Sequence, residues 1–446
     1  MKKIYCIWIG GIGVSALARY YLSIGWTVLW SDDSNSSIIE NLQKEGAYIT
    51  IGQNIDWIDE SISKVVYSEA IPENHPQRIH SMHQNIQTLS YPQAIGEITQ
   101  DLELISIAGT HGKSTTTTLL SLILKASELN FCTIVGTLVP DFWGKNFFYR
   151  NEKIDEKLYF VLESCEYKWS FLNYKPKIWI ITNLEADHLD YYKNIENYTQ
   201  AFQTFLDNIR PGGFAVINME DEGSKKLKRE RTDISYVEMY KDYYLWCWES
   251  YNYRDIQMQV PWDHVLMDAK LAYAVWFLCN AKPEEILWWL KSYTWTWRRM
   301  ETIGKTHYGN ILMSDYGHHP TEILVTTKAL KEAYPEKKIY CVFQPHQYSR
   351  TIELIEDFKK CFIYCYTLVI PNIYASRDSE ENMKKLTAES FVWEIHHKNK
   401  FFGEGFENTL RLIHDYDSTE PSSSIILLMG AGDIDSLRNK IETSPL

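Results

Sequence analysis

The sequence predicts an α/β protein of three domains. Three observations predict it: a strand, a glycine-rich turn and a helix open the chain, a second such unit follows residue 103, and short strands alternate with helices in the last third. Elements that alternate in this way build parallel sheets with helices on their faces. We therefore expect a Rossmann-like N-terminal domain over residues 1–99, a central domain with a parallel sheet of the P-loop ATPase type over 100–304, and a Rossmann-like C-terminal domain over 305–446.

Composition and charge narrow the class of protein. The 446 residues carry a net charge of −13 and eight scattered cysteines without a C-x-x-C pair. An acidic chain argues against a nucleic-acid partner, and cysteines in this arrangement indicate neither a disulfide framework nor a structural zinc site. No apolar run reaches the roughly 18 residues that a membrane-spanning helix needs. We expect a cytoplasmic enzyme without a nucleic-acid or membrane partner, as a monomer or a homodimer.

The N-terminal segment has the outline of a Rossmann-type nucleotide site. An apolar strand over residues 3–9 runs into a turn that contains Gly10, Gly11 and Gly13, and a helix follows. The next strand, over residues 27–30, ends at Ser31, Asp32 and Asp33. In such units a phosphate group binds at the start of the helix, and an acidic residue after the second strand contacts the sugar. An NAD site is the alternative that this pattern leaves open.

The clearest functional motif is a turn between an apolar strand, residues 104–108, and a leucine-rich helix. Its residues are Gly109, Thr110, His111, Gly112, Lys113, Ser114 and Thr115. Backbone N–H groups of such a turn and the positive end of the helix dipole face an anion. Lys113 adds a charge for the outer phosphates, and the hydroxyl of Ser114 or Thr115 can ligate Mg²⁺. Because Lys-Ser directly after glycine argues against an ordinary turn, we predict a nucleoside triphosphate site.

Charged residues follow two further strands of the predicted central domain. One strand ends at Glu163, with Glu166 shortly after it, and the next runs into a segment that contains His188. The carboxyl ends of parallel strands form the ligand-binding edge of an α/β sheet. Mg²⁺ prefers hard oxygen ligands, so either Glu163 or Glu166, together with a hydroxyl of the phosphate turn, suits it. His188 is a candidate ligand of a second ion or an orienting residue, and a surface histidine is the alternative.

Polar segments also follow the strands of the predicted C-terminal domain. They span residues 315–322, 344–351, 374–377 and 430–433. Pro320 and Asp433 are good helix-start residues, so helix capping explains part of this pattern. Arg298 and Arg299, before this domain, form a pair that can grip triphosphate oxygens as a fork, with a surface basic pair as the alternative. The basic run over 225–231 is predicted to be a solvated helix face.

Taken in order, these motifs resemble those of the Mur ligase family, in particular of its alanine-adding branch. The shortened phosphate turn, residues 109–115, the segment 182–190, and the segments 315–322 and 344–351 carry the resemblance. It implies ATP-dependent ligation of L-alanine to the carboxylate of UDP-N-acetylmuramate through an acyl phosphate, in peptidoglycan precursor synthesis. ATP and Mg²⁺ are then the cofactors, and UDP-N-acetylmuramate and L-alanine are the substrates.

The resemblance also implies roles for single residues. It places the UDP-sugar at Gly10, Gly11, Gly13, Asp32 and Ser68, and the metal at Ser114, Glu163 and His188. It places ATP at Gly109, Thr110, His111, Gly112, Lys113, Ser114, Thr115, His264, Arg298, Arg299 and Asp315, and the incoming amino acid at Tyr316. It places the reacting groups at Lys113, Arg299, His318 and Arg350. Gln347 stands on a family arginine, so we expect weaker phosphate binding there, or binding shared with Arg350.

Two alternatives to the alanine-adding activity stay open. A ligase that attaches recycled tripeptide to the same UDP-sugar would share most of the motifs, although the segments 318–322 and 344–346 favour alanine. The chain could instead be a catalytically impaired homologue that only binds the UDP-sugar, because several family positions are substituted. These positions are Trp8, Trp30, Trp262, Val265, Trp295 and Gln347.

Tryptophan is unusually frequent in this chain and glycine is scarce. There are 16 tryptophans and 21 glycines, whereas average usage predicts about 31 glycines. Four of the tryptophans stand where the family has glycine: Trp8, Trp30, Trp262 and Trp295. We hypothesise that these residues, together with Trp143 and Trp276, are glycines encoded by UGA codons that were translated with the wrong code. UGG codons at these positions would contradict the hypothesis.

Overall fold

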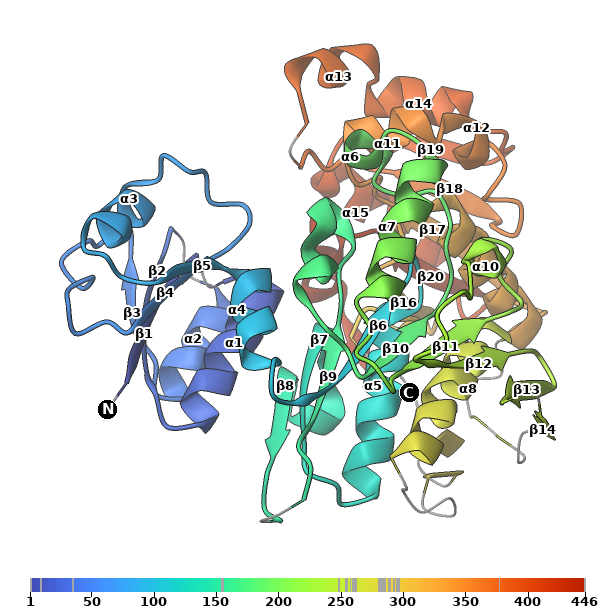
Figure 1. Ribbon diagram of the computed structural model, residues 1–446. Helices are drawn as coiled ribbons and strands as arrows, with labels where there is room; N and C mark the ends of the chain where they lie inside the picture. Colours follow the sequence, from blue (N-terminus) through green and yellow to red (C-terminus); the bar gives the residue numbers. More distant parts are fainter. Residues whose placement is uncertain are drawn as a thin grey trace. The chain divides into compact units, whose positions relative to one another are not determined.

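The structure is a computed structural model, shown in Figure 1. It describes residues 2–8, 10–33, 36–153, 156–247, 249–252, 256, 258, 263–279, 286–287, 290–291, 293, 297–376 and 378–444. The chain divides into two compact units. Unit 1 comprises Met1–Ala186, Ile195–Gln259 and Val265–Tyr293, and unit 2 comprises Asp187–Asn194, Val260–His264 and Thr294–Leu446. The predicted domain limits at 99 and 304 stay a prediction.

The first sheet of unit 1 is the Rossmann-like sheet that the sequence predicts. Its five strands are parallel and lie in the order β3-β2-β1-β4-β5. Because the order reverses between β1 and β4, the crevice at their carboxyl ends is where such sheets bind ligands. The elements are β1 (Lys3–Ile7), α1 (Ile12–Ser23), β2 (Thr27–Asp32), α2 (Ser37–Lys44), β3 (Tyr48–Ile51), β4 (Lys64–Tyr67), α3 (Pro76–His83), β5 (Thr88–Ser90) and α4 (Tyr91–Ile98).

The second sheet of unit 1 has nine strands in the order β14-β13-β12-β11-β10-β6-β9-β7-β8. It is parallel from β12 to β7 and antiparallel at both edges. β6 lies inside the sheet, and its apolar residues are fully buried, as is typical of a parallel strand covered on both faces. The parallel part confirms the predicted central sheet, and the phosphate turn follows its strand β6.

The candidate site residues of the central sheet lie at the carboxyl ends of β6, β9 and β10. The strands of this sheet and the helices that connect them have the following bounds. They are β6 (Glu103–Ala108), α5 (Lys113–Ala126), β7 (Phe131–Val139), η1 (Pro140–Phe142), β8 (Lys145–Arg150), β9 (Tyr159–Glu163), η2 (Tyr167–Asn173), β10 (Ile178–Ile181), α7 (Ile195–Asp207), β11 (Phe214–Asn218), η3 (Ser224–Lys226), β12 (Ser235–Met239), β13 (Tyr243–Trp246), β14 (Glu249–Asn252) and α8 (Asp263–Leu278). The short helix α6 (Leu189–Tyr192), between β10 and α7 in the sequence, belongs to unit 2.

Unit 2 contains a seven-stranded sheet in the order β19-β18-β17-β20-β16-β15-β21. The strands from β19 to β16 are parallel, so the segments that follow β16, β17 and β20 share one edge of the sheet. The elements are β15 (Glu301–Thr306), β16 (Ile311–Asp315), α10 (Pro320–Ala333), β17 (Lys338–Phe343), α11 (Tyr348–Glu353), α12 (Ile355–Phe358), β18 (Thr367–Ile370), α13 (Glu380–Lys385), α14 (Ala388–Glu394), β19 (Lys400–Phe402), α15 (Phe406–Thr419), β20 (Ser424–Met429), η4 (Asp433–Lys440) and β21 (Thr443–Ser444).

The basic run over residues 225–231 does not form the predicted helix face. Its first two residues, Lys225 and Lys226, belong to the short η3, and the rest of the run is not helical. Its only apolar residue is Leu227, so the run has no apolar stripe that would hold a helix against the core. Instead, Arg231 donates to the carbonyl oxygens of Asp207 and Ile209 at the end of α7, at 3.0 and 2.7 Å.

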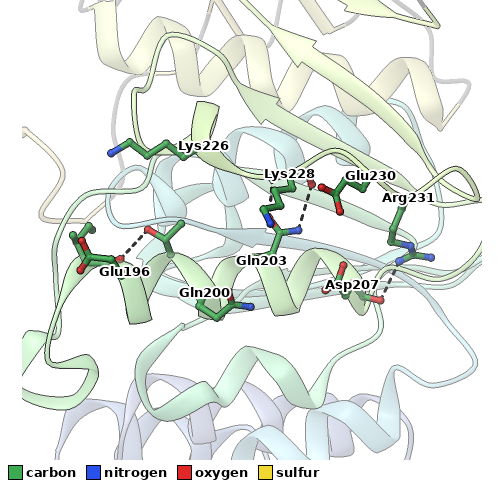
Figure 2. Close-up of a pocket in the computed structure, with 10 residues that line it drawn as sticks. Glu196, Gln200, Gln203, Asp207, Lys226, Lys228, Glu230 and Arg231 are labelled. Carbon is green, nitrogen blue, oxygen red and sulfur yellow. Dashed lines mark hydrogen bonds between the residues drawn. The ribbon is translucent and has the colours of Figure 1, made fainter.

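Beside α7 this run lines a hollow of about 600 Å³, which Figure 2 shows with its acidic and basic side chains facing one another. Basic Lys226, Lys228 and Arg231 stand with acidic Glu196, Asp207 and Glu230 in the lining. The mixture of charges matches no single class of ligand. Among the described residues, no helix is both long and apolar enough to cross a bilayer.

Candidate active site

The phosphate turn of unit 1 depends on two glycines. Gly109 and Gly112 have φ angles of 146° and 78°, which L side chains rarely adopt. A Cβ atom on Gly109 would collide with the side chain of Thr182, and one on Gly112 would lie 2.5 Å from the Oδ1 atom of Asp268. Only glycine fits at both places, and α5 begins directly after Gly112.

The segment after β10 braces this turn. Asn183 accepts a hydrogen bond from the backbone N–H of His111 at 2.8 Å and donates to the His111 carbonyl at 3.0 Å. Thr110 accepts from the backbone N–H of Glu185 at 3.0 Å. The sequence predicted a ligand motif over residues 182–190, and the structure adds that residues 182–185 hold the phosphate turn in shape. Sequence reasoning missed this role, and an asparagine directly after a strand beside the turn was the available signal.

Lys113 is paired with a buried carboxylate. Its Nζ atom lies 3.3 Å from Glu166, which is fully buried, and it donates to the carbonyl oxygens of Gly109 and Thr110. Tyr198 also donates to Glu166, at 3.2 Å. These contacts fold the lysine back over the turn that would hold the phosphates. Removing either partner of such a buried pair would leave the other charge uncompensated.

Glu163 lies beside the first hydroxyl of the helix. Ser114 donates to its Oε1 atom at 3.0 Å, and the backbone N–H of Gly136 donates to its Oε2 atom at 2.6 Å. A carboxylate and a hydroxyl in contact at a phosphate turn are hard oxygen ligands that suit Mg²⁺. Of the two glutamates, Glu163 therefore contacts the candidate metal hydroxyl, and Glu166 contacts Lys113. His188 belongs to unit 2, so its place in a metal site with Ser114 stays a prediction.

The predicted UDP-sugar residues lie at the carboxyl ends of the first sheet. Gly10 donates its backbone N–H to the Oδ2 atom of Asp32 at 2.8 Å, which ties the turn after β1 to the end of β2. Ser68 follows β4 and donates its backbone N–H to the carbonyl of Ile7. Gly11 caps α1, and Gly13 lies in its first turn, where a Cβ atom would be 3.1 Å from the ring of Tyr91.

In unit 2, the buried Asp315 organises the turn after β16. Its carboxylate accepts the backbone N–H groups of Gly317 and Met300, both at 2.7 Å. Burial raises the pKa of Asp315, although the nearby Arg299 opposes this. The sequence assigned Asp315 to the ATP ribose, and that contact stays a prediction. The observed bonds show that this carboxylate also closes a backbone turn.

The two neighbouring arginines have different environments. The guanidinium carbons of Arg298 and Arg299 lie 4.9 and 5.1 Å from the ring centroid of Tyr316, as in cation–π contacts. Arg298 is buried, which lowers its pKa, and it donates to the carbonyls of Gly430 and Gly432 after β20. Sequence reasoning missed this anchoring role. The predicted fork around triphosphate oxygens is therefore a role to test at Arg299 in particular.

His318 lies just before the N-cap of α10, and its side chain is partly buried. Burial, with a further contribution from Arg350, lowers the pKa of His318 to about 3, so its imidazole is neutral near pH 7. Its backbone N–H donates to Glu322 at 2.8 Å, and its Nδ1 atom lies 3.2 Å from the carbonyl oxygen of Tyr316. The next residue, His319, caps α10 together with Glu322, which confirms that helix-start chemistry explains part of the segment 315–322. A neutral imidazole can orient a reacting group without adding charge.

Arg350 forms a buried ion pair with Asp187. Its Nε and Nη2 atoms lie 3.2 and 3.1 Å from the Oδ1 atom of Asp187, and both side chains are less than a tenth exposed. Burial alone would raise the pKa of Asp187, but His188 and Arg350 hold it well below its usual range. Asp187 belongs to the predicted segment 182–190, yet nothing in the sequence indicated Arg350 as its partner.

Gln347, on the predicted arginine position, binds backbone groups. Its Nε2 atom donates to the carbonyl of Ser376 at 3.0 Å, and its φ angle is 74° at the start of α11. His264 lies in the first turn of α8, and its predicted ATP contact stays a prediction. Trp262 and Trp295 lie outside the described residues, and the side chain of Trp276 is also outside them.

Comparison with known proteins places this geometry in a family. The Mur ligase family, catalytic domain, matches residues 3–102, the Mur ligase middle domain matches 107–262, and the Mur ligase, glutamate ligase domain, matches 298–432. The chain is 33% identical to the UDP-N-acetylmuramate–L-alanine ligase of Clostridium acetobutylicum, over 97% of this chain and 96% of that protein. The chain belongs to the Mur ligase family. Members of this family use ATP, in agreement with the phosphate turn.

Other relatives and solved structures agree with this membership. The UDP-N-acetylmuramate–L-alanine ligase of Alkaliphilus metalliredigens is 32% identical over 97% of this Mur ligase and 95% of its own length. The solved UDP-N-acetylmuramate-alanine ligase MurC of Thermotoga maritima has a TM-score of 0.76 at 22% identity, covering 99% and 98% of the two chains. The murein peptide ligase of Psychrobacter arcticus has a TM-score of 0.72 at 18% identity, with the same coverage. At such identities these two structures show the fold alone.

Proposed function

We propose that this Mur ligase joins L-alanine to the carboxylate of UDP-N-acetylmuramate, with ATP and Mg²⁺, in peptidoglycan precursor synthesis. The observation that carries the proposal is the 33% identity to an alanine-adding ligase over 97% of the chain. The site supports it independently, because Lys113, Ser114 and Glu163 surround a glycine turn suited to a triphosphate with its metal.

Residues of both units have roles in the proposed reaction. Lys113 and Arg299 would bind oxygens of the γ-phosphoryl group and stabilise the charge that develops there while the muramate carboxylate attacks it. Ser114 and Glu163 would hold Mg²⁺, which supplies charge neutralisation at the triphosphate. The products of this first step are ADP and an acyl phosphate.

The second step joins the amino acid. The amine of L-alanine, held near Tyr316, attacks the acyl phosphate carbon, and a tetrahedral intermediate forms. It collapses to the amide as the C–O bond to phosphate breaks, and the amine proton leaves to solvent. Arg350, oriented by Asp187, and the neutral His318 would contact the reacting oxygens. Most of the acceleration would come from fixed charges and positioning.

Phosphate release tests the proposal. The purified chain, ATP and Mg²⁺ should release phosphate only when both UDP-N-acetylmuramate and L-alanine are present, and mass spectrometry should find the alanyl product. Release with glycine or L-serine in place of L-alanine measures the amino-acid preference.

The second function is the tripeptide ligase that the motifs leave open, and a murein peptide ligase has the same fold, with a TM-score of 0.72 beside the 0.76 of the alanine-adding enzyme. Under this alternative the amine comes from a recycled tripeptide. Phosphate release with the tripeptide L-Ala-γ-D-Glu-meso-diaminopimelate but not with L-alanine would favour it. Binding of the UDP-sugar without phosphate release for any amine would favour an impaired homologue.

A further inference from the structure

Two tryptophans of unit 1 occupy backbone positions that suit glycine. Trp8 and Trp143 have φ angles of 58° and 57°, in the left-handed region where a Cβ atom crowds the backbone. The other described residues with positive φ are mostly polar types such as Asn85, Glu128 and Ser422. Asparagine tolerates this region because its short side chain bonds locally, and glycine because it has no Cβ, but an indole has neither advantage.

Trp8 has a second anomaly. It directly follows β1, and its backbone N–H donates to the carbonyl of Ser31 at 3.0 Å, so pairing with β2 continues to this residue. Its indole Nε1 atom is buried and finds no acceptor among the described residues. Trp30 and Trp179 also have a buried Nε1 atom without an acceptor there, so this feature supports the argument at Trp8 only together with its φ angle. Glycine at this position would remove both the strained φ angle and the unsatisfied donor.

Trp143 lies in the link between the antiparallel strands β7 and β8. It is followed by Gly144, whose φ angle is 71°, so two successive residues are left-handed. Links with two such residues are dominated by glycine and asparagine. The indole of Trp143 is 77% exposed, so burial of its ring does not offset the backbone strain. Trp169 also has a positive φ angle, but it shares its kink with Lys168.

We infer that the native polypeptide carries glycine at positions 8 and 143, and that the UGA codons there are read as glycine by the cells that make it. The sequence hypothesis covered further tryptophans. At Trp30 the φ angle is not positive, so the backbone there adds nothing to the hypothesis.

The inference changes the candidate UDP-sugar site. Position 8 lies at the carboxyl end of β1, beside the crevice where the strand order of the first sheet reverses. A glycine there would let the backbone approach a diphosphate closely, as the turn before α5 does with Gly109. This consequence rests on the proposed function, whereas the identity of the residues at 8 and 143 does not.

Tandem mass spectrometry of the protein from its native cells tests the residue identity. Trypsin should release the peptides 4–19 and 126–145, which contain positions 8 and 143, and the peptide 20–44, which contains Trp26 as control. Trp26 packs on Tyr21 with ring centroids 4.9 Å apart, and its φ angle is not positive. We expect glycine at 8 and 143 and tryptophan at 26, with UGA and UGG codons respectively. Tryptophan at 8 or at 143, or glycine at 26, would overturn the inference.

Recombinant variants test the consequence for binding. Calorimetric titration with UDP compares three proteins: the chain with tryptophan at both positions, called here the printed chain, and the variants W8G and W143G. Because glycine relieves a left-handed side chain at the turn, W8G should bind UDP at least about tenfold more tightly than the printed chain. W143G relieves similar strain at a residue that follows η1 and whose indole stacks on Phe148, outside the turn after β1, so it should leave the affinity unchanged. Equal affinity of W8G and the printed chain would overturn the account of the turn, whatever the ligase assay shows.

Discussion

Two strand–turn–helix units of unit 1 are built alike but completed differently. The turn after β6 places Gly109 and Gly112 at its left-handed positions, and neighbouring side chains leave no room for a Cβ atom at either. The turn after β1 has Trp8 at its left-handed position, whereas Gly11 has an ordinary extended conformation in open space. The comparison teaches that the glycines of such a motif matter most at its left-handed positions, which glycine fills in the turn after β6 and tryptophan fills in the turn after β1.

The two turns also differ in what holds them. In the segment that follows β10, Asn183 accepts from His111 and Glu185 donates to Thr110, and these bonds fix the turn after β6. The turn after β1 is tied mainly by the bond from Gly10 to Asp32. We therefore expect substitutions in the turn after β6 to cost more stability and activity than substitutions in the turn after β1.

The largest effect is expected for Lys113→Met. It removes the cation that the complete turn holds beside Glu166, so kcat for phosphate release should fall about a thousandfold. Single-turnover and steady-state phosphate assays measure it, and circular dichroism checks that the variant is folded. If kcat of the folded variant falls by less than about tenfold, Lys113 does not take part in the reaction as proposed.

The second prediction concerns the buried ion pair between Asp187 and Arg350 in unit 2. Asp187→Asn should destabilise the protein by about 3 kcal/mol at pH 7, because Arg350 stays buried without its carboxylate. The matched control Glu381→Gln removes a solvent-exposed ion pair with Lys385 and should change stability by about 0.5 kcal/mol or less. Urea unfolding followed by circular dichroism measures both.

The same pair has a pH dependence with a definite sign. The pKa of Asp187 in the folded protein lies below the unfolded value of about 3.9. Its contribution to stability is therefore fully present above that pH and is lost as the pH falls. The difference in unfolding free energy between the unsubstituted protein and Asp187→Asn should shrink below about pH 4. A difference that stays constant down to pH 2 would contradict the ionised pair.

Paired glycine substitutions test the comparison of the turns directly. Gly112→Ala should destabilise the protein by about 1–3 kcal/mol, because its φ angle is 78° and a Cβ atom would press on Asp268. Gly11→Ala should change stability by less than about 0.5 kcal/mol, because its φ angle is −70° and no atom lies near. Equal losses for the two variants would show that the turns do not differ as described.

The smallest effect is expected for Glu163→Gln. It weakens one oxygen ligand of the proposed metal site, so half-maximal phosphate release should need about tenfold more Mg²⁺. Glu166→Gln, which contacts Lys113 instead, should leave the Mg²⁺ requirement unchanged even if kcat falls. The reverse result would exchange the roles of the two glutamates.

Local patterns predicted the elements and the turns, because a strand, its glycine turn and the next helix are close in sequence. The pairs that complete the site join residues far apart in the chain, such as Arg350 with Asp187 and Arg298 with Gly430. The topology of the sheets determines which distant strand ends meet, and local sequence patterns do not specify that topology. The choice between Glu163 and Glu166 also needed the structure, since only the direction of each side chain separates them.

One measurement tests the central claim most directly: phosphate release by the chain with ATP and Mg²⁺, with each substrate omitted in turn, and with the mass of the product determined. The account predicts release that requires both UDP-N-acetylmuramate and L-alanine, a product heavier by one alanine residue, and loss of release in Lys113→Met. Release that does not depend on the UDP-sugar, or a normal rate in Lys113→Met, would contradict it.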